Sequence, residues 1–240
     1  MKNTLGRLRI KIFADGANVE IMKRAYREGF VKGFTTNPTL MKKAGVTDYK
    51  AFAREALSEI KKLPISFEVF SDDFAGMETE ALEIASWAPN VYVKIPITDT
   101  SGEPAIALIK KLSAKGLQLN ITAITTLEQV RAAADALSAD SRSVVSVFAG
   151  RVADTGRDPV PHMAEALRMI AKKPNIELLW ASPRELLNIF QADACGCHII
   201  TVSDDILKKN PMAGMDLGEL SLETVKMFHR DAVSSGFKIV

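Results

Sequence analysis

The stretch NVYVKIP at residues 90–96 carries one charge, Lys94, and its other members are apolar or aromatic apart from Asn90 and Pro96. Such near-continuous hydrophobicity is typical of a parallel β-strand that is covered on both faces. Burying an ammonium group in such a strand costs far more free energy than burying carbon. Lys94 therefore requires either a buried carboxylate partner or a chemical role for a desolvated amine.

Similar short runs recur along the chain, and helix-like segments lie between them. Strands are expected at residues 9–14, 33–36, 65–69, 91–95, 118–123, 143–149, 177–181 and 198–202. In the segment before the third strand, Phe52, Ala56 and Ile60 fall on one helical face. Eight strand–helix units in 240 residues predict the α/β class, as a single-domain (β/α)8 TIM barrel over residues 1–216.

The boundaries of the predicted helices carry suitable capping residues. These are Asp48, Thr125 or Thr126, and Asp204. Residues 217–240 follow the last unit as an extra C-terminal helix, which carries an apolar stripe near one face: Leu220, Val225, Phe228 and Ala232. We expect this helix to pack on its own barrel or on a neighbouring subunit.

An open, doubly wound sheet is the alternative architecture. It would normally place a G-x-G-x-x-G turn after its first strand. The chain has DGAN at residues 15–18 instead, which favours the barrel.

Composition and charge exclude several functions. Hydrophobic residues make up 47% and charged residues 25% of the chain, as in an ordinary globular protein. A formal net charge of +2, without a long basic block, gives no basis for nucleic-acid binding. Residues 1–8 lack the apolar stretch of a signal peptide, and no apolar run is long enough to span a bilayer. We therefore expect a cytoplasmic protein without a membrane partner.

The two cysteines, Cys195 and Cys197, directly precede His198. This run could supply half of a metal site, but there is no third cysteine, and the other histidines, His162 and His229, are isolated. Buried, reduced cysteines beside a strand are the favoured interpretation, so no structural metal is expected.

The carboxyl ends of the predicted strands carry polar groups, and in a barrel those ends meet at one rim. Lys94, Asn120 and Ser146 lie 26 residues apart, so each repeating unit delivers one polar residue. A lone aspartate or asparagine at a strand end is usually a cap or turn residue. Polar groups at seven consecutive strand ends instead predict one shared site: Asp15, Asn37, Ser66, Glu68, Lys94, Asn120, Thr122, Ser146, Arg151, Ser182 and Arg184.

The chemistry of these groups is complementary. A desolvated amine such as that of Lys94 is a nucleophile toward a carbonyl, and the resulting imine stabilises a carbanion. Asp15 is a candidate acid or base for a substrate hydroxyl, and Glu68 with Thr122 is suited to hold a water molecule.

The remaining polar groups are suited to bind a sugar phosphate. Amides such as those of Asn37 and Asn120 suit sugar hydroxyls, and two arginines beside a serine form an anion clamp of the kind that phosphate needs. The clamp residues are Arg151, Ser182 and Arg184. Together these groups predict carbon–carbon bond chemistry on a sugar phosphate.

In their order along the chain, these motifs resemble those of the transaldolase family. They are ADG at 14–16, TTNPT at 35–39, SFEV at 66–69, VKIP at 93–96, NIT at 120–122, SVFAGRV at 146–152 and ASPR at 181–184. They run from the first strand to the loop after the seventh. The length of the chain resembles the small, barrel-only branch, which includes fructose-6-phosphate aldolase-like proteins.

The resemblance implies a Schiff-base mechanism without a metal or organic cofactor. Lys94 would attack the C2 carbonyl of a ketose phosphate such as fructose 6-phosphate or sedoheptulose 7-phosphate. Asp15 would take the C4 hydroxyl proton as the C3–C4 bond breaks, and Glu68 and Thr122 would position the catalytic water. Substrate binding would fall to Asn37, Ser66, Asn120, Ser146, Phe148, Arg151, Ser182 and Arg184.

Three residues bear on which activity is expected. Aldolase members of the family, which release free dihydroxyacetone, typically carry glutamine in place of Glu68 and tyrosine in place of Phe148, so both residues favour transfer. Pro183 departs from the aromatic residue that is usual between the serine and the arginine. Proline fixes φ and removes an N–H, so a differently substituted sugar, such as a sulfonate, remains an alternative.

Three functions are thus open: a transaldolase of the pentose phosphate pathway, a fructose-6-phosphate aldolase, and a sugar-phosphate-binding protein without turnover. The last is disfavoured because Lys94, Asp15, Glu68 and Thr122 occur together. Small members of the family often form rings, so the resemblance also implies a homo-oligomer, a pentamer or a decamer.

Overall fold

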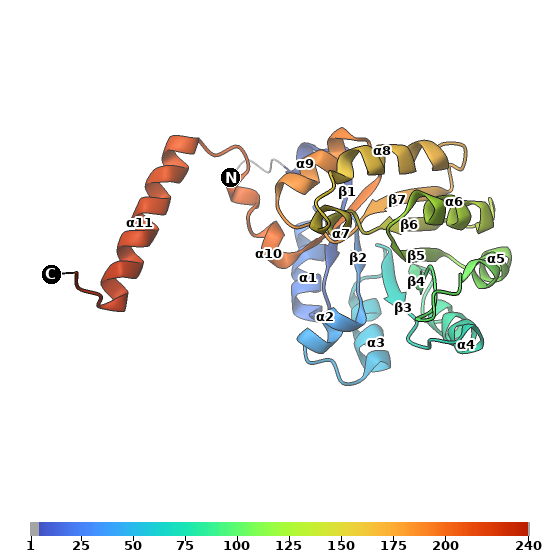
Figure 1. Cartoon of the computed structure of the whole chain (residues 1–240). Coiled ribbons are helices and arrows are strands. Elements are labelled where there is room, and N and C mark those ends of the chain that lie inside the picture. Colours follow the sequence, from blue (N-terminus) through green and yellow to red (C-terminus); the bar gives the residue numbers. More distant parts are fainter. Residues whose placement is uncertain (1–4, 240) are drawn as a thin grey trace.

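The computed structural model describes residues 5–239, so residues 1–4 of the N-terminal stretch and Val240 lie outside the described residues. Eight parallel strands close into a barrel in chain order, and β8 pairs with β1 (Figure 1). The strands are β1 Lys11–Asp15, β2 Gly33–Thr35, β3 Ile65–Glu68, β4 Val91–Pro96, β5 Leu119–Ile124, β6 Ser143–Val147, β7 Ile176–Trp180 and β8 Ile199–Ser203. The predicted (β/α)8 barrel is confirmed, and the open doubly wound sheet is excluded.

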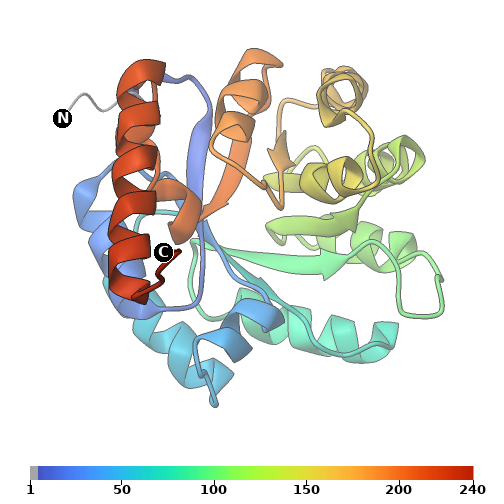
Figure 2. The same cartoon turned by 60° about the vertical axis from the view of Figure 1, so that its left-hand side comes forward.

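Helices surround the barrel on its outside (Figures 1 and 2). They are α1 Val19–Glu28, α2 Pro38–Lys43, α3 Tyr49–Glu59, α4 Phe74–Ala85, α5 Ile106–Ala114, α6 Leu127–Ala136, α7 Ala149–Asp154, α8 Pro159–Ile170, α9 Leu187–Ala194 and α10 Asp204–Leu207. A further helix, α11 Leu217–Ser235, follows them. Two short 3-10 turns, η1 Leu5–Arg7 and η2 Asn210–Met212, complete the described elements.

Two short helices, α2 and α7, were not expected. Asn37 caps α2 by accepting a hydrogen bond from the Leu40 N–H at 2.9 Å, and Pro38 occupies the first helical turn, where its missing N–H is tolerated. The sixth strand ends at Val147, two residues before the predicted end, because the chain turns at Phe148 into α7.

Side-chain caps account for several helix starts. Asp48 accepts from the Ala51 N–H at 2.9 Å, and Thr126 forms a capping box with Gln129. Thr126, not Thr125, is therefore the cap of α6. Asp204 is the first residue of α10, and the cap position is Ser203.

The buried apolar residues form two layers. The larger layer lies between the strands and the helices, and Phe34, Phe67 and Trp180 are fully buried in it. The smaller layer fills the inside of the barrel, where Phe13 and Tyr92 pack with a few aliphatic side chains. This inner layer separates the two ends of the barrel, as is typical of the fold.

The C-terminal helix α11 stands apart from the barrel (Figure 1). Its side chains are largely exposed, including the apolar residues Leu217 at 77%, Val225 at 60% and Phe228 at 63%. No helix within residues 5–239 combines the length and the hydropathy needed to cross a membrane.

Candidate active site

The register of three adjoining strands places Lys94 beside Glu68 and Asn120. Glu68 on β3 is opposite Lys94 on β4, and Lys94 is opposite Asn120 on β5. The Lys94 side chain is only 8% exposed, and its Nζ lies 3.0 Å from Oε2 of Glu68. Nζ also donates to the carbonyl oxygen of Thr36 at 3.2 Å. The buried lysine thus has a carboxylate partner and a carbonyl acceptor.

A chain of hydrogen bonds across three strands fixes the amide of Asn120. Its Nδ2 donates to Oγ of Ser66 at 3.0 Å, and its Oδ1 accepts from Oγ of Ser146 at 2.6 Å. All three side chains are buried. Because each amide end has a partner, the orientation of Asn120 beside Lys94 is set by the protein itself.

Thr122 has a buried hydroxyl that makes no hydrogen bond with any residue in the range 5–239. The strand is irregular here, since its register with β6 shifts between Ile121 and Ile124 and Ala123 has a positive φ of 61°. An unpaired buried hydroxyl costs about 1–3 kcal/mol, so such groups call for an explanation. This hydroxyl is available to a water or to a polar atom of a bound molecule.

Asp15 ends β1 in a shielded position. Its Oδ1 accepts a hydrogen bond of 2.7 Å from the Thr35 hydroxyl, which also contacts the hydroxyl of Thr201 on β8. Burial raises the pKa of Asp15 above its ordinary value; the Thr35 hydrogen bond and the Lys94 charge oppose this rise, and the Glu68 charge adds to it. Asp15, Glu68 and Lys94 therefore interact electrostatically across the rim.

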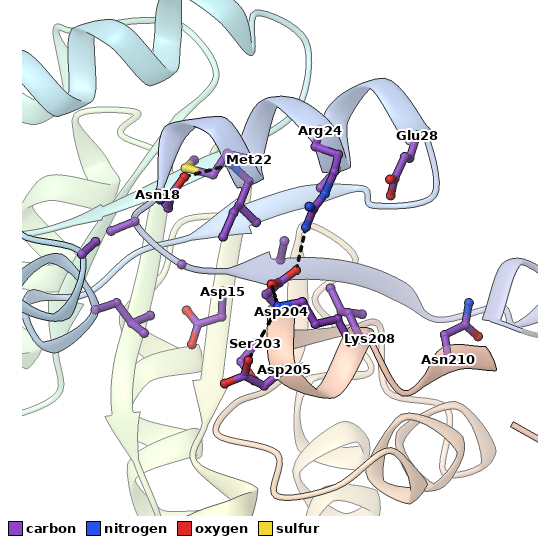
Figure 3. A pocket seen from close by; sticks show the side chains of 18 of the residues that line it. Asp15, Asn18, Met22, Arg24, Glu28, Ser203, Asp204, Asp205, Lys208 and Asn210 are labelled. Carbon is purple, nitrogen blue, oxygen red and sulfur yellow. Dashed lines mark hydrogen bonds and ion pairs between the residues drawn. The ribbon is translucent and has the colours of Figure 1, made fainter. Parts of the chain in front are cut away.

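A cavity of about 770 Å³ opens next to Asp15, between α1 and α10 (Figure 3). Arg24 of α1 reaches across it to Asp204 of α10, with 3.1 Å between Nη2 and Oδ1. Asp15 lines this cavity, whereas Glu68 and Lys94 are not among its lining residues.

The helix α7, which carries Arg151, packs against the loop after β7, which carries Arg184. A Cβ on Gly150 would overlap the carbonyl oxygen of Ser182, so the close approach requires glycine, and Ser182 itself has a positive φ of 62°. Arg184 donates through Nε to Oδ1 of Asp154 at 2.9 Å, and its Nη1 lies 3.4 Å from Oγ of Ser182. This ion pair lowers the pKa of Asp154.

The other arginine of the predicted clamp, Arg151, stacks over the ring of Phe148, with 5.3 Å from its Cζ to the ring centroid. Both arginines are exposed, and none of their described contacts reaches Lys94. The structure thus gathers Lys94, Glu68 and Asp15 at the barrel rim, with the Ser66–Asn120–Ser146 chain and Thr122 beside them. Arg151 lies on α7, and Arg184 and Asn37, whose Oδ1 caps α2, lie on loops around the rim.

Three residues at the site were not predicted from the sequence to have a role there. Thr35 lies within a quoted motif, but only the fold shows that its hydroxyl binds Asp15. Thr201 gives no signal beyond being polar within an apolar strand, and Asp154 none beyond following the AGRV segment.

The cysteine segment is apart from these groups. Burial raises the pKa of Cys197 to about 12, and its Sγ contacts the carbonyl oxygens of Leu178 and Ile199, both at 3.3 Å. Within residues 5–239, no three or more His, Cys, Asp or Glu side chains gather in a way that could hold a metal ion.

The fold and this site define a class, the (β/α)8-barrel proteins whose rim centres on a buried lysine paired with a carboxylate. The family model described as Transaldolase/Fructose-6-phosphate aldolase matches residues 12–239. The chain belongs to this family, which confirms the resemblance that the motifs indicated.

Individual relatives support the same family assignment. The chain is 36% identical over 200 residues to a probable transaldolase of Dehalococcoides mccartyi, covering 82% of this chain and 88% of that one. It is 36% identical over 196 residues to a probable transaldolase of Streptococcus agalactiae, covering 81% and 86%. A probable transaldolase of Methanococcus maripaludis is 35% identical over 201 residues, covering 83% and 89%.

The raised pKa of Asp15 predicts that this carboxylate destabilises the fold at neutral pH. A carboxyl whose pKa is higher in the folded than in the unfolded chain contributes stability when protonated and loses it as pH rises through the folded pKa. Asp15→Asn keeps an acceptor for Thr35 without the charge, so it should raise the melting temperature at pH 7. The gain should shrink as pH falls toward 3.8, the ordinary pKa of an aspartate. Melting scans at several pH values check this, and a loss of stability at pH 7 would contradict it.

Proposed function

We propose that the protein is a transaldolase, which transfers a dihydroxyacetone unit from a ketose phosphate to an aldose phosphate through an imine on Lys94. The observation that carries the proposal is the buried Lys94 amine, 3.0 Å from Glu68 and in electrostatic range of Asp15. Fructose 6-phosphate and sedoheptulose 7-phosphate, sugars of the pentose phosphate pathway, are the proposed donors. The probable transaldolases that the chain resembles support transaldolase activity.

Imine formation would begin when Nζ of Lys94 attacks the C2 carbonyl of the ketose. The amine must first lose a proton, and the Glu68 carboxylate is placed to receive it. Loss of the former carbonyl oxygen as water then gives the iminium ion. The unpaired Thr122 hydroxyl would hold this water, and Glu68 would exchange protons with it during imine formation and later hydrolysis.

Cleavage would follow with Asp15 as the base. Its carboxylate takes the proton of the C4 hydroxyl, the C3–C4 bond breaks, and the electron pair moves into the iminium to form an enamine. The aldose phosphate leaves, and the dihydroxyacetone unit stays on Lys94. When an acceptor aldehyde binds, the enamine attacks its carbonyl carbon and Asp15 returns the proton.

The fixed amide of Asn120 and the Nδ2 group of Asn37 would hold the dihydroxyacetone hydroxyls, with Ser66 and Ser146 keeping Asn120 in place. The phosphate of the substrate would lie between α7 and the loop after β7. Arg184 keeps Nη1 near Ser182 while Asp154 holds the other side of its guanidinium, and Arg151 lies over Phe148. Two planar guanidinium groups are well suited to a phosphate.

The alternative is an aldolase that releases free dihydroxyacetone, and Glu68 and Phe148 argue against it. Phe148 gives Arg151 an apolar ring to stack on and brings no hydroxyl to the rim. Pro183, next to Ser182, leaves a sulfonate-bearing sugar as a second alternative substrate.

Transfer and release differ in their need for an acceptor. With fructose 6-phosphate alone, we expect no sustained release of dihydroxyacetone. With erythrose 4-phosphate added, sedoheptulose 7-phosphate should accumulate. Both products can be followed by chromatography. Release of dihydroxyacetone at the same rate without the acceptor would instead establish the aldolase.

The Thr122 hydroxyl should matter for turnover and not for folding. Thr122→Val removes a buried hydroxyl that lacks a partner, so the free energy of unfolding should stay unchanged or rise by up to about 1 kcal/mol, while kcat falls at least tenfold. Ser146→Ala is the matched comparison, since it removes a hydroxyl that donates at 2.6 Å, and it should lower stability by about 1 kcal/mol. Urea unfolding and steady-state kinetics check both. An unchanged kcat in Thr122→Val would show that the Thr122 hydroxyl takes no part in the mechanism.

We also propose that α11 packs on a neighbouring copy of the chain in a homo-oligomer. Residues 1–216 would then form the catalytic barrel, and residues 217–240 an assembly segment. Support comes from the exposed stripe of Leu217, Val225 and Phe228, which its own barrel does not cover. Large apolar side chains exposed together on one helix are typical of an interaction surface.

Charge placed on this stripe should disrupt the oligomer. Phe228→Glu should lower the mass measured by light scattering, because a buried unpaired carboxylate is unfavourable at an apolar interface. Arg230→Glu puts the same residue on the opposite face of α11 and should keep the parent mass. A parent protein that is monomeric, or a Phe228→Glu variant with the parent mass, would refute this role.

A further inference from the structure

The end of the barrel opposite Lys94 holds a second, larger cavity. Its volume is about 1220 Å³, and the residues that precede or begin the strands line it, from Lys11 at the start of β1 to His198 just before β8. The inner layer of Phe13 and Tyr92 closes it toward the rim that carries Lys94. It is therefore separate from the proposed active site.

The charge lining this cavity is one-sided. Among the described residues that line it, Glu177 is the only acidic one, and six are basic: Arg9, Lys11, Lys32, Lys62, Arg142 and Lys173. The whole chain has 31 basic and 29 acidic residues, so this imbalance is local. Like charges gathered at a concave surface create a strong positive potential.

Four of these cations have no carboxylate partner in the part of the chain that the structure describes. Among the described residues, no carboxylate oxygen lies within 4.0 Å of Arg9, Lys32, Lys62 or Arg142, whereas Glu177 pairs with Lys11 at 2.7 Å. Lys32 donates instead to the carbonyl oxygen of Gly29 at 3.1 Å. The cations also come from several sides of the mouth. Lys32 and Lys62 precede β2 and β3, Arg9 and Lys11 flank the start of β1, and Arg142 and Lys173 precede β6 and β7.

Two neutral donors point to a ligand as well. Nδ1 of His198 accepts from the Leu178 N–H at 3.0 Å, which leaves the proton on Nε2. Neither this Nε2 nor the Tyr92 hydroxyl is among the buried polar atoms that lack a partner within residues 5–239, so a ligand in the cavity could reach both. Both residues line the cavity with the cations, so donors greatly outnumber acceptors there.

We propose that this basic cavity binds a small organic ligand with two or more phosphate groups. The cations come from the starts of five different strands, and a ligand with two phosphates can pair with more of them at once than a single phosphate can. The volume exceeds the usual 300–1,000 Å³ of small-molecule sites, so it has room for a sugar bisphosphate or a nucleotide together with water. The concave shape and the low net charge of the whole chain do not suit a nucleic-acid duplex.

Calorimetric titration tests the proposal with three probes: fructose 1,6-bisphosphate, ADP and inorganic phosphate. One of the first two should bind at low ionic strength, and inorganic phosphate should bind at least tenfold more weakly. Which of the two binds tells whether the scaffold is a sugar or a nucleoside. Arg142→Ala and Lys62→Ala should each weaken binding about tenfold, the loss expected for one charge-assisted hydrogen bond.

Two control variants locate the binding. Arg184→Ala weakens the proposed phosphate clamp at the opposite rim, so the binding that remains in this variant belongs to the basic cavity. Arg54→Ala removes an exposed cation on α3 and should leave the affinity unchanged. No binding of either organic probe would overturn the proposal. So would binding that is lost in Arg184→Ala, which would place the ligand at the rim, or an equal loss in Arg54→Ala, which would make it non-specific attraction.

Discussion

The ion pair between Lys94 and Glu68 is the interaction on which the rest of the site depends. Its two charges lie 3.0 Å apart with side chains only 8% and 18% exposed, so neither is well solvated. Removing one partner of such a buried pair usually destabilises a protein by about 3–5 kcal/mol. The pair requires the register in which Glu68 on β3 faces Lys94 on β4, and the closed barrel brings Asp15 on β1 to the same rim. The placement of the Lys94 amine beside its proton acceptor, Glu68, thus depends on the pairing of the strands.

The barrel divides the molecule into two ends with different properties. At the carboxyl ends of the strands, one amine, an amide and several hydroxyls are buried beside two partly exposed carboxylates, and the exposed arginines lie on α7 and on the loop after β7. At the amino ends, basic side chains surround a wide cavity without enough carboxylates to balance them. The Phe13 and Tyr92 layer between them keeps these ends apart. A ligand at one end would therefore act on the other only through the strands.

The sequence predicted what repeats along the chain and what lies close in it. The strands, the caps at Asp48 and Thr126, and the rim position of Lys94 follow from local patterns. The contact between Thr35 and Thr201 joins residues 166 positions apart, and that between Asp154 and Arg184 joins residues 30 apart, so neither left a local signal. The basic cavity was missed for the same reason, because its cations are scattered singly before different strands. The short helices α2 and α7 were missed because each is only six residues long.

The proposed transfer depends on an imine between Lys94 and the substrate. Borohydride reduction in the presence of fructose 6-phosphate, followed by peptide mass spectrometry, measures this imine directly. We expect a dihydroxyacetone-derived adduct on Lys94 in the parent protein. We expect none in Lys94→Arg, which keeps the positive charge beside Glu68 but cannot form an imine. An adduct on another lysine, or an adduct that persists in Lys94→Arg, would contradict the proposed role of Lys94.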